Sequence, residues 1–358
     1  MSLESYLSGF HERDWEETTD GTTRFALIGL GWWTVDEAIP AIAASDHCET
    51  TVLVSSSTEK AQGVAADAQP DATGISYDQF HDGVATDDYD AVYVGTPNAL
   101  HLPYVRSAAE FGKDVLCEKP MEATTERAEQ LVETCADHGV QLAVGYRMQT
   151  EPAVRRAREL IRERVIGEPR YVHGANYQRL FDINPNEDQW RLSADLSGYG
   201  TSVMDLGIYP LNTARFLLDA DPVSAQATMR STHPAFEDVP DEHASFTLTF
   251  ENDVLAACTT SQNAHGTDHL EITGTEGRIR FDPAFHMETD LSVTVGEETV
   301  TFDTSEVNQM TEVFDYAGYC FANDEPVAFD GEHGLVDMRA IEAIHEAAES
   351  GDRVEIPK

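Results

Sequence analysis

Positive charge is scarce in this chain of 358 residues, which has 23 Lys and Arg against 65 Asp and Glu and a formal net charge of −42. Nucleic acids and anionic membranes attract basic patches, and the sequence offers none, which argues against both kinds of partner. The carboxylates are spread among periodic apolar segments, which predicts a folded protein with an acidic, solvated surface. Such a surface repels itself in dilute buffer, whereas molar salt screens charges beyond roughly 3 Å. We therefore expect a halophilic protein.

Cysteine and histidine lack the spacings of a disulfide framework or a metal site. The five cysteines are odd in number and include no CxxC pair, so we expect reduced residues in the core. The 13 histidines are scattered along the chain without the spacing of a recognised metal motif, so no metal is predicted. The N-terminus has no basic start or twin arginine, and no apolar run reaches membrane-spanning length, which predicts a cytoplasmic protein.

Apolar and amphipathic segments alternate through the first half of the chain. The apolar runs expected to be strands are RFALIGL, TTVLVSS, DAVYVGT, KDVLCEKP and QLAVGYR. Helical stretches such as residues 101–112 and 124–139 separate them, which predicts a parallel sheet wrapped by crossover helices. After about residue 170 one strong helix, residues 202–218, precedes Thr- and Val-rich strands that predict a mostly antiparallel sheet. A final amphipathic helix is expected at residues 332–351.

The first apolar run ends in a Gly-x-Gly turn at Gly29 and Gly31, followed by a helical pattern. In a dinucleotide-binding loop the first glycine permits the tight turn, and the second lets the backbone approach a pyrophosphate at the helix start. Thr34 stands where a third glycine serves close helix–strand packing, which weakens the match without removing the phosphate site. The alternative is an ordinary glycine turn. Trp32 and Trp33 are cofactor candidates, with packing as the favoured interpretation.

The second expected strand ends without the Asp or Glu that usually binds the ribose hydroxyl of NAD. It ends in VSSSTEK, where Ser55, Ser56 and Ser57 offer hydroxyl donors and Lys60 offers a positive charge. These groups suit a 2′-phosphate, and a cap of the next helix is an alternative compatible with the same residues. The predicted cofactor is therefore NADP.

Two separated motifs resemble the glucose-fructose oxidoreductase and inositol dehydrogenase family (Gfo/Idh/MocA). The first is GTPN at residues 95–98, with His101 after it and Glu118-Lys119-Pro120 at the end of a later strand. The second is Asp205-x-Gly-x-Tyr209 in the strong helix. The resemblance extends from about residue 24 to the C-terminus.

The resemblance implies an α/β protein with an N-terminal Rossmann-type parallel sheet and a C-terminal α+β domain that has a large, mostly antiparallel open sheet. We predict an N-terminal arm over residues 1–22, a dinucleotide-binding domain over 23–147, and a substrate-binding and oligomerisation domain over 148–358. We expect one face of the C-terminal sheet to be too apolar to leave in water. Family relatives cover it with another subunit, so a homodimer or homotetramer is expected.

Site residues are implied by the same motifs. Lys119 takes the position of the active-site lysine, Asp205 that of the helix aspartate and Tyr209 that of the acid/base. Further cofactor contacts are implied at Thr96, Pro97, Asn98, His101, Glu118, Lys119 and Arg147. Substrate candidates, besides the three catalytic residues, are Tyr177, Trp190 and Arg191. For these three and for Arg147, an interdomain ion pair or core packing is an equal explanation.

These residue types fit the oxidation of an alcohol. Hydride leaves carbon only as the hydroxyl proton departs, so a base must lie within hydrogen-bond reach of the oxygen. A tyrosine deprotonates far above neutrality unless a positive charge is near, and Lys119 can supply that charge. Asp205 and Tyr209 are four residues apart and share one helical face.

The leading prediction is NADP-dependent oxidation of an aldopyranose at C1 to its lactone, with D-xylose favoured and D-glucose as the second candidate. The tyrosine form of the helix motif resembles the branch of the family with sugar dehydrogenases more than the histidine-bearing inositol branch. Two alternatives stay open: a non-catalytic NADP-sensing regulator of the same fold, and a sugar-to-sugar oxidoreductase with tightly bound NADP. The intact Lys, Asp and Tyr disfavour the first, and the lack of an export signal disfavours the second.

Overall fold

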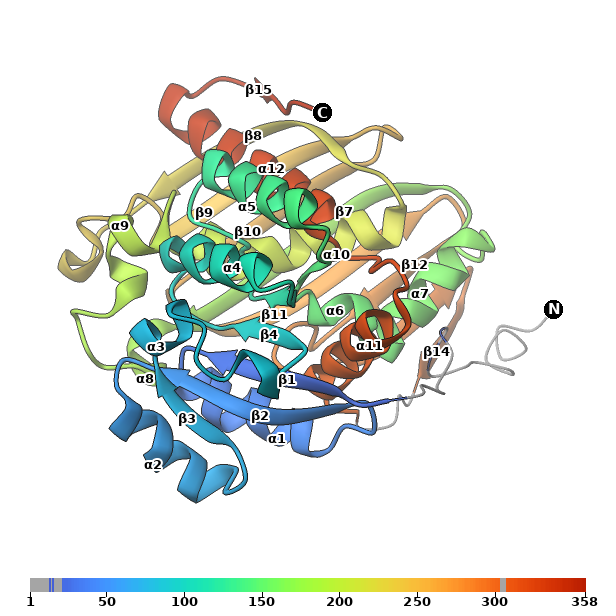
Figure 1. The fold of residues 1–358 in the computed structure, drawn as a ribbon. Helices are drawn as coiled ribbons and strands as arrows, with labels where there is room; N and C mark the ends of the chain where they lie inside the picture. Colours follow the sequence, from blue (N-terminus) through green and yellow to red (C-terminus); the bar gives the residue numbers. More distant parts are fainter. Residues whose placement is uncertain (1–12, 14, 16–20, 303–306) are drawn as a thin grey trace. The chain divides into compact units, whose positions relative to one another are not determined.

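The computed structural model describes residues 13, 15, 21–302 and 307–358, so nearly all of the predicted arm over residues 1–22 lies outside the described residues. The chain forms two compact units (Figure 1). The N-terminal unit comprises Trp15–Arg147 and Asn308–Leu335. The C-terminal unit contains Met148–Val307 and Val336–Lys358. The predicted domain boundaries stay a prediction.

The N-terminal unit is built on a six-stranded sheet of order β3-β2-β1-β4-β5-β6. All five strand pairings are parallel. This is the Rossmann order, in which ligands bind outside the carboxyl ends of the strands where the order reverses, here between β1 and β4. The strands are β1 (Thr23–Ile28), β2 (Cys48–Ser55), β3 (Thr73–Ser76), β4 (Ala91–Val94), β5 (Asp114–Cys117) and β6 (Leu142–Val144).

The helices of this unit connect successive strands, with one exception. The exception is α11 (Gln309–Asn323), which packs its Phe314 ring 5.4 Å from Phe25 of β1 and 5.2 Å from Tyr93 of β4. A segment far along the chain thus completes the core of the first sheet. The other helical elements are η2 (Thr34–Ala38), α1 (Ile39–Ala43), α2 (Thr58–Ala68), α3 (Tyr77–His81), η3 (Thr86–Asp88), η4 (Asn98–Leu100), α4 (His101–Glu110), α5 (Thr125–His138) and α6 (Arg147–Thr150), which continues into the C-terminal unit.

The C-terminal unit contains a nine-stranded sheet of order β14-β13-β12-β11-β7-β10-β9-β8-β15. Its pairings are antiparallel except that of β7 with β10. The predicted α/β class, with one parallel and one mostly antiparallel sheet, is therefore confirmed. The strands are β7 (Pro169–Arg179), β8 (Pro222–Arg230), β9 (His243–Phe250), β10 (Leu255–Ser261), β11 (Asn263–Gly274), β12 (Gly277–Phe281), β13 (Leu291–Val295), β14 (Glu298–Phe302) and β15 (Val354–Glu355).

Helices cover one face of this sheet, which we call the inner face. The predicted strong helix is a π-helical turn, η6 (Val203–Gly207), continued by α10 (Ile208–Leu218). A Cβ atom on Gly174 of β7 would lie 2.6 Å from the Pro210 side chain, so glycine permits the close approach of α10. The other helical elements are α7 (Pro152–Arg162), α8 (Leu180–Ile183), η5 (Trp190–Leu192), α9 (Ala194–Ser197), η7 (Pro234–Phe236) and α12 (Gly331–Ser350), which begins in the N-terminal unit.

The outer face of the sheet is less apolar than predicted. Tyr171 and Leu255, which are 51% and 47% exposed and lie opposite each other in the register, are large apolar residues on it. Neighbouring outward positions on β9 and β10 are small or hydroxylated: Ser245, Thr247, Thr249, Ala257 and Thr259. The expectation of a face too apolar to leave in water is wrong for this part of the sheet, because the alternating pattern turns the apolar residues inward.

All five cysteines are free and buried, which confirms the prediction of unpaired core thiols. No helix within the described ranges is long and apolar enough to cross a membrane. Among the described residues, no group of three or more His, Cys, Asp and Glu side chains is placed to hold a metal ion.

Candidate active site

The structure of the glycine loop shows how Thr34 is accommodated in place of a third glycine. Gly29 has φ +93°, and a Cβ atom on it would lie 2.8 Å from the carbonyl oxygen of Gly95. Thr34 is completely buried, and its hydroxyl donates a hydrogen bond of 2.7 Å to the Gly29 carbonyl. A Cβ atom on Gly95 would lie 2.8 Å from Thr34 Oγ1, so Gly95 supplies the space that the threonine takes. The helix and the strands therefore still pack closely, with Gly95 in the role of the missing third glycine.

The loop retains features that fit a pyrophosphate. Gly31 is exposed, and a Cβ atom on it would meet none of the described atoms within 4 Å, so this side of the loop is open. A helical segment begins directly after it, and the first N–H groups of a helix have no partner within the helix. Thr96, after β4, is buried, and its hydroxyl has no hydrogen-bond partner among the described residues. This orphaned donor stands next to the turn, because its methyl carbon lies 2.8 Å from the Gly29 Cβ position.

The two tryptophans after the loop differ. Trp33 is half-buried, its indole N–H lies 3.3 Å from Glu118 Oε1, and the Arg147 guanidinium lies 5.9 Å from its ring centre. Packing is therefore its evident role. Trp32 packs edge-to-face on Trp33, with 5.4 Å between the ring centres, but it is 46% exposed and stays a cofactor candidate.

Glu118 and Lys119 follow β5 at the carboxyl end of the sheet. Glu118 Oε1 also accepts a 2.8 Å hydrogen bond from the buried Tyr93 hydroxyl, and Glu118 Oε2 accepts the backbone N–H of Lys119 at 3.1 Å. Burial, and then the negative charge of Glu118, raises the pKa of Tyr93 well above its ordinary value, so Tyr93 stays a donor. Glu118 thus ties the lysine segment to β4 and to the glycine loop.

His101 and Arg147 are placed inside the N-terminal unit. His101 is fully buried, and its ring nitrogens lie 2.8 Å from the Thr96 carbonyl and 3.1 Å from the Met121 carbonyl. It joins the two motif loops, so the structure supports a positioning role and not direct cofactor contact. Arg147 is also buried and donates to Gln309 of α11, which favours the packing explanation.

The serine-rich end of β2 divides into buried and exposed hydroxyls. Ser55 is completely buried, so its prediction as a cofactor contact is not supported. Ser56, Ser57 and Lys60 are exposed. Ser57 caps α2 by accepting the Lys60 N–H at 3.2 Å, as the capping alternative predicts, and its own O–H still can donate elsewhere. An exposed helix start with two hydroxyls and a lysine suits an anionic group.

In the C-terminal unit, Asp205 lies in η6 and is held by two donors. Its Oδ2 accepts hydrogen bonds from Arg191 Nε at 2.8 Å and from Gln262 Nε2 at 3.0 Å. The Arg191 guanidinium also lies 4.5 Å from the ring centre of Trp190. The substrate candidates Arg191 and Trp190 therefore belong to the surroundings of Asp205. No sequence signal marks Gln262, which follows an alternating strand and belongs to no motif.

Tyr209 is the second residue of α10 and is half-buried, with the Phe285 ring centre 5.7 Å from its own. Phe285 lies in a loop whose Ala284 and Phe285 N–H groups donate to Asp268 Oδ2 at 2.7 and 2.5 Å. Phe285 and Asp268 thus support the tyrosine, and no motif in the sequence marks them.

Tyr177 is on the other face of the sheet. Along β7, Gly174 faces α10 and Asn176 donates to the Leu206 carbonyl, so alternate residues point the opposite way. Tyr177 is one of these, and its hydroxyl lies 2.5 Å from the outward-facing Thr259 hydroxyl. The structure does not bring Tyr177 together with Asp205 and Tyr209, because the period of two in a strand separates them.

Two clusters result, one in each unit. The glycine loop, Thr96, Glu118 and the Lys119 segment gather at the carboxyl end of the parallel sheet. Asp205 and Arg191 are bonded to each other in the second unit, and Tyr209 follows four residues later on the same helical segment. The common action of Lys119, Asp205 and Tyr209 stays a prediction.

Comparison with known proteins agrees with this architecture. Residues 23–146 match the family model of the oxidoreductase family with an NAD-binding Rossmann fold, and residues 154–280 match that of the GFO/IDH/MocA C-terminal domain. D-xylose 1-dehydrogenase [NADP(+)] of Haloarcula marismortui is 52% identical over 99% of this chain and 100% of that protein.

More distant relatives cover nearly as much. D-xylose 1-dehydrogenase (NADP(+)) 2 of Haloferax volcanii is 31% identical over 93% of this chain and 99% of its own length. The crystal structure of aldose-aldose oxidoreductase from Caulobacter crescentus, complexed with glycerol, has a TM-score of 0.87 at 30% identity and covers 93% of this chain and 99% of that one. The chain therefore belongs to the GFO/IDH/MocA oxidoreductase family.

Proposed function

We propose that the protein is an NADP-dependent sugar 1-dehydrogenase that oxidises an aldopyranose, D-xylose in preference to D-glucose, to its lactone. The observation that carries the proposal is the intact catalytic set, Lys119, Asp205 and Tyr209, in a chain 52% identical to a D-xylose 1-dehydrogenase. A regulator of the same fold needs a cofactor site but has no use for this set. The alternative of a non-catalytic sensor is therefore disfavoured.

NADP fits the N-terminal unit. The open side of Gly31 and the helix start after it support the pyrophosphate there, and the orphaned Thr96 hydroxyl supplies a donor beside the turn. Ser56, Ser57 and Lys60 support recognition of the 2′-phosphate, because β2 ends without a carboxylate to repel it. Trp32, Pro97 and Asn98 are assigned to the same site by their place in the motif loops.

The protein side of the reaction is a proton transfer. When bound, NADP would accept the hydride, the hydrogen with its electron pair, from C1 of the sugar. Tyr209 takes the proton of the C1 hydroxyl, so that the carbonyl of the lactone forms as the C–H bond breaks. Lys119 is the cation assigned to assist this proton transfer, by its place in the family motif. Asp205, a carboxylate paired with Arg191, orients the sugar hydroxyl.

A second candidate function is favoured by one specific likeness. The aldose-aldose oxidoreductase of Caulobacter crescentus shares the fold closely at 30% identity. An enzyme of that kind keeps its cofactor bound and returns the hydride to a second sugar. The two functions differ in whether NADP leaves after each turnover.

We further propose a halophilic, cytoplasmic homo-oligomer that uses the C-terminal sheet. The net charge of −42 supports a salty environment, and five free, buried thiols suit a reducing compartment. The exposed Tyr171 and Leu255 support a contact on the outer face, where the surrounding Ser and Thr hydroxyls allow a hydrated interface. Light scattering in molar KCl tests the assembly, and a monomer mass would contradict it.

The function is tested by incubating purified protein with pentoses, hexoses and polyols and either NADP or NAD in molar KCl. We expect NADPH to appear in many-fold excess over enzyme with D-xylose, and the lactone as product. NADP that stays bound through gel filtration, with turnover only when a second sugar is present, would favour the sugar-to-sugar oxidoreductase. Binding of NADP without turnover of any sugar would refute both enzymes.

A further inference from the structure

We propose that Gln262 is a positioning residue for Asp205, whose carboxylate it holds in one orientation through a side-chain N–H bond. The inference rests on the proposed function, in which Asp205 acts as an ionised, oriented carboxylate. Gln262 belongs to neither family motif, and its contacts within the C-terminal unit carry the inference.

Gln262 stands between β10 and β11 and is completely buried. Its backbone N–H donates to the Glu242 carbonyl at 3.0 Å, and its carbonyl accepts the Leu180 N–H at 2.8 Å. Its side-chain Oε1 accepts Gln178 Nε2 at 2.7 Å. These bonds hold the backbone of Gln262 and the oxygen of its side-chain amide in place independently of Asp205.

The orientation of the amide follows from what faces it. Nε2 lies 3.0 Å from Asp205 Oδ2 and 3.5 Å from the Thr201 carbonyl. A carboxylate and a carbonyl both only accept, so the group facing them must be the NH₂. The Thr201 carbonyl also accepts the Asp205 N–H at 3.0 Å. Gln262 therefore binds the same helical turn that carries the Asp205 carboxylate.

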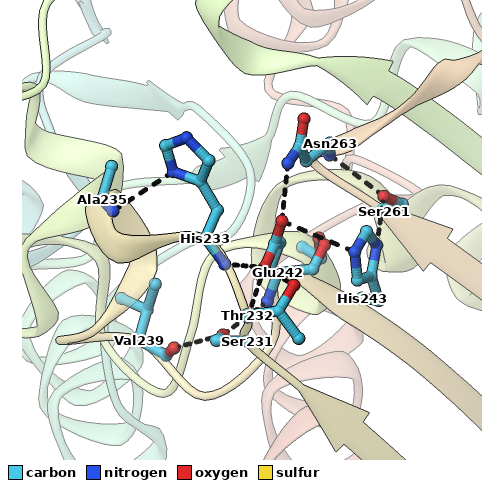
Figure 2. A network of polar contacts seen from close by, with 10 residues as sticks. Ser231, Thr232, His233, Ala235, Val239, Glu242, His243, Ser261 and Asn263 are labelled. Atoms are coloured by element: carbon cyan, nitrogen blue, oxygen red, sulfur yellow. Dashed lines mark hydrogen bonds and ion pairs between the residues drawn. The ribbon is translucent and has the colours of Figure 1, made fainter.

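A buried carboxylate, Glu242, holds the segment next to Gln262 (Figure 2). Glu242 accepts from Asn263 Nδ2 at 2.6 Å and from the Thr232 and His233 N–H groups at 2.6 and 2.9 Å. Burial alone would raise the pKa of Glu242, but these bonds outweigh burial and lower the pKa to about 2. Glu242 thus stays ionised and anchors Asn263, the neighbour of Gln262.

The same loop fixes the start of the helix. Asp241 is buried and accepts the Thr201 and Val203 N–H groups at 2.6 and 2.7 Å. The Ser202 hydroxyl donates to the Glu242 carbonyl at 3.0 Å. The helix turn and the amide that grips Asp205 are therefore held by one strand-end segment, residues 241–242, which sets their relative position.

Arg191 and Gln262 have different effects on Oδ2. Arg191 carries a positive charge, which attracts Oδ2 even when the geometry of their hydrogen bond is imperfect. Gln262 is neutral and contributes only through its directed N–H bond. Loss of the amide therefore changes the orientation of the carboxylate and weakens its ionised form without changing the net charge. Among the described residues of the C-terminal unit, the ionisable groups near this turn include Arg191, Tyr209, Asp241, Glu242, His243 and His345. The Nε2 atom of His243 lies 3.5 Å from Glu242, and that of His345 lies 3.7 Å from Asp241.

The test is Gln262→Met, which keeps the volume and removes the donor. A lost donor to a charged acceptor corresponds to a shift of about one to two pH units, so the acid limb of kcat/KM should move upward by that amount. We expect kcat to fall about tenfold or more while the NADP affinity is unchanged. In an Asp205→Asn background, Gln262→Met should cause little further loss, because Gln262 acts through Asp205. Gln262→Asn, which withdraws the amide by one methylene, is a milder variant should the methionine prevent folding.

Gln149→Met is the matched control, because Gln149 is another buried glutamine of the same unit, and its amide donates to Asn212 at 3.0 Å. It should lower the thermal midpoint comparably and leave the acid limb in place. A limb that does not move in Gln262→Met, or losses that add in the double variant, would overturn the proposal.

A readout that needs no turnover separates this proposal from the proposed function. The protonation midpoint of Asp205 is followed by carboxyl-stretch infrared difference spectra against Asp205→Asn, in wild type and in Gln262→Met. A higher midpoint in Gln262→Met supports the positioning role even in a protein that oxidises no sugar. An unchanged midpoint refutes it, whether or not the protein is a dehydrogenase.

Discussion

Thr34 and Gly95 form a matched pair in the glycine loop, and exchanging each for alanine tests whether they depend on each other. Gly95→Ala places a Cβ atom 2.8 Å from Thr34 Oγ1 and 3.0 Å from Tyr93 Cε1. Overpacking of this kind costs about 1–3 kcal/mol of unfolding free energy. Thr34→Ala removes the hydrogen bond to the Gly29 carbonyl, which costs about 1–3 kcal/mol if that buried acceptor is left unsatisfied.

The double variant distinguishes a matched pair from two independent defects. Thr34→Ala removes the atom with which the Gly95 Cβ collides most closely, so the second substitution should cost about 1 kcal/mol less in that background. For a unit of this size about 1 kcal/mol corresponds to a change of roughly 2–4 °C in the thermal midpoint. Gly95→Ala should also weaken NADP binding, because relief of the clash displaces the helix start beside the loop.

The assay is thermal unfolding in molar KCl without cofactor, together with NADP titration followed by the fluorescence of Trp32 and Trp33. Gly95→Val serves as the control, since its larger side chain should not be rescued by Thr34→Ala. Midpoint shifts that simply add, or an unaltered midpoint in Gly95→Ala, would refute the account of how threonine replaces the third glycine.

Four further predictions follow from the site. Lys119→Ala and Tyr209→Phe should each lower kcat by roughly 10²–10⁴-fold with NADP binding kept, and wild-type turnover in either variant would remove that residue from the mechanism. Ser56→Asp should shift the kcat/KM ratio from NADP toward NAD by about ten- to a few hundred-fold, whereas Ser55→Ala should not change the ratio because Ser55 is buried. Activity and thermal midpoint should rise with KCl into the molar range, and equal stability at low and molar salt would contradict the halophilic proposal. Because the pKa of Glu242 is lowered from 4.5 to about 2, its contribution to stability is present above pH 4.5 and lost as the pH falls toward 2, so urea unfolding of Glu242→Gln should vary less across that window.

Most of the first sheet could be predicted because its strands are short apolar runs between helical stretches. The strand missed was β3, Thr73–Ser76, whose sequence TGIS has only one large apolar residue. The helix α11 was missed for another reason, since its apolar face packs against a sheet whose contacting residues lie more than two hundred positions earlier in the chain. Local periodicity indicates a helix, but not the unit against which it packs.

The central strand of the second sheet, β7, could not be recognised from the sequence. In β7, Pro169–Arg179, the helix-facing positions include Gly174 and Asn176, so the alternation that marks β9 and β10 is absent. Without that register, the sequence could not show that Tyr177 points to the outer face. A residue type suited to a sugar site was recognised, but its direction depends on strand parity, which only the pairing reveals.

Both motif helices contain a π-helical turn near their start, η2 after the glycine loop and η6 around Asp205. Such turns are rare, are weaker than regular α-helix and occur often at functional sites. Side-chain hydrogen bonds tie each turn to its surroundings, because Thr34 of η2 donates to the Gly29 carbonyl and Asn176 of β7 donates to the Leu206 carbonyl of η6 at 3.2 Å. A π turn shifts the following residues around the helix axis relative to those before it, so its position helps to set where Tyr209 points. Propensity and periodicity assume a uniform helix, which is why the motifs marked the catalytic side chains while the residues that aim them could be found only in the fold.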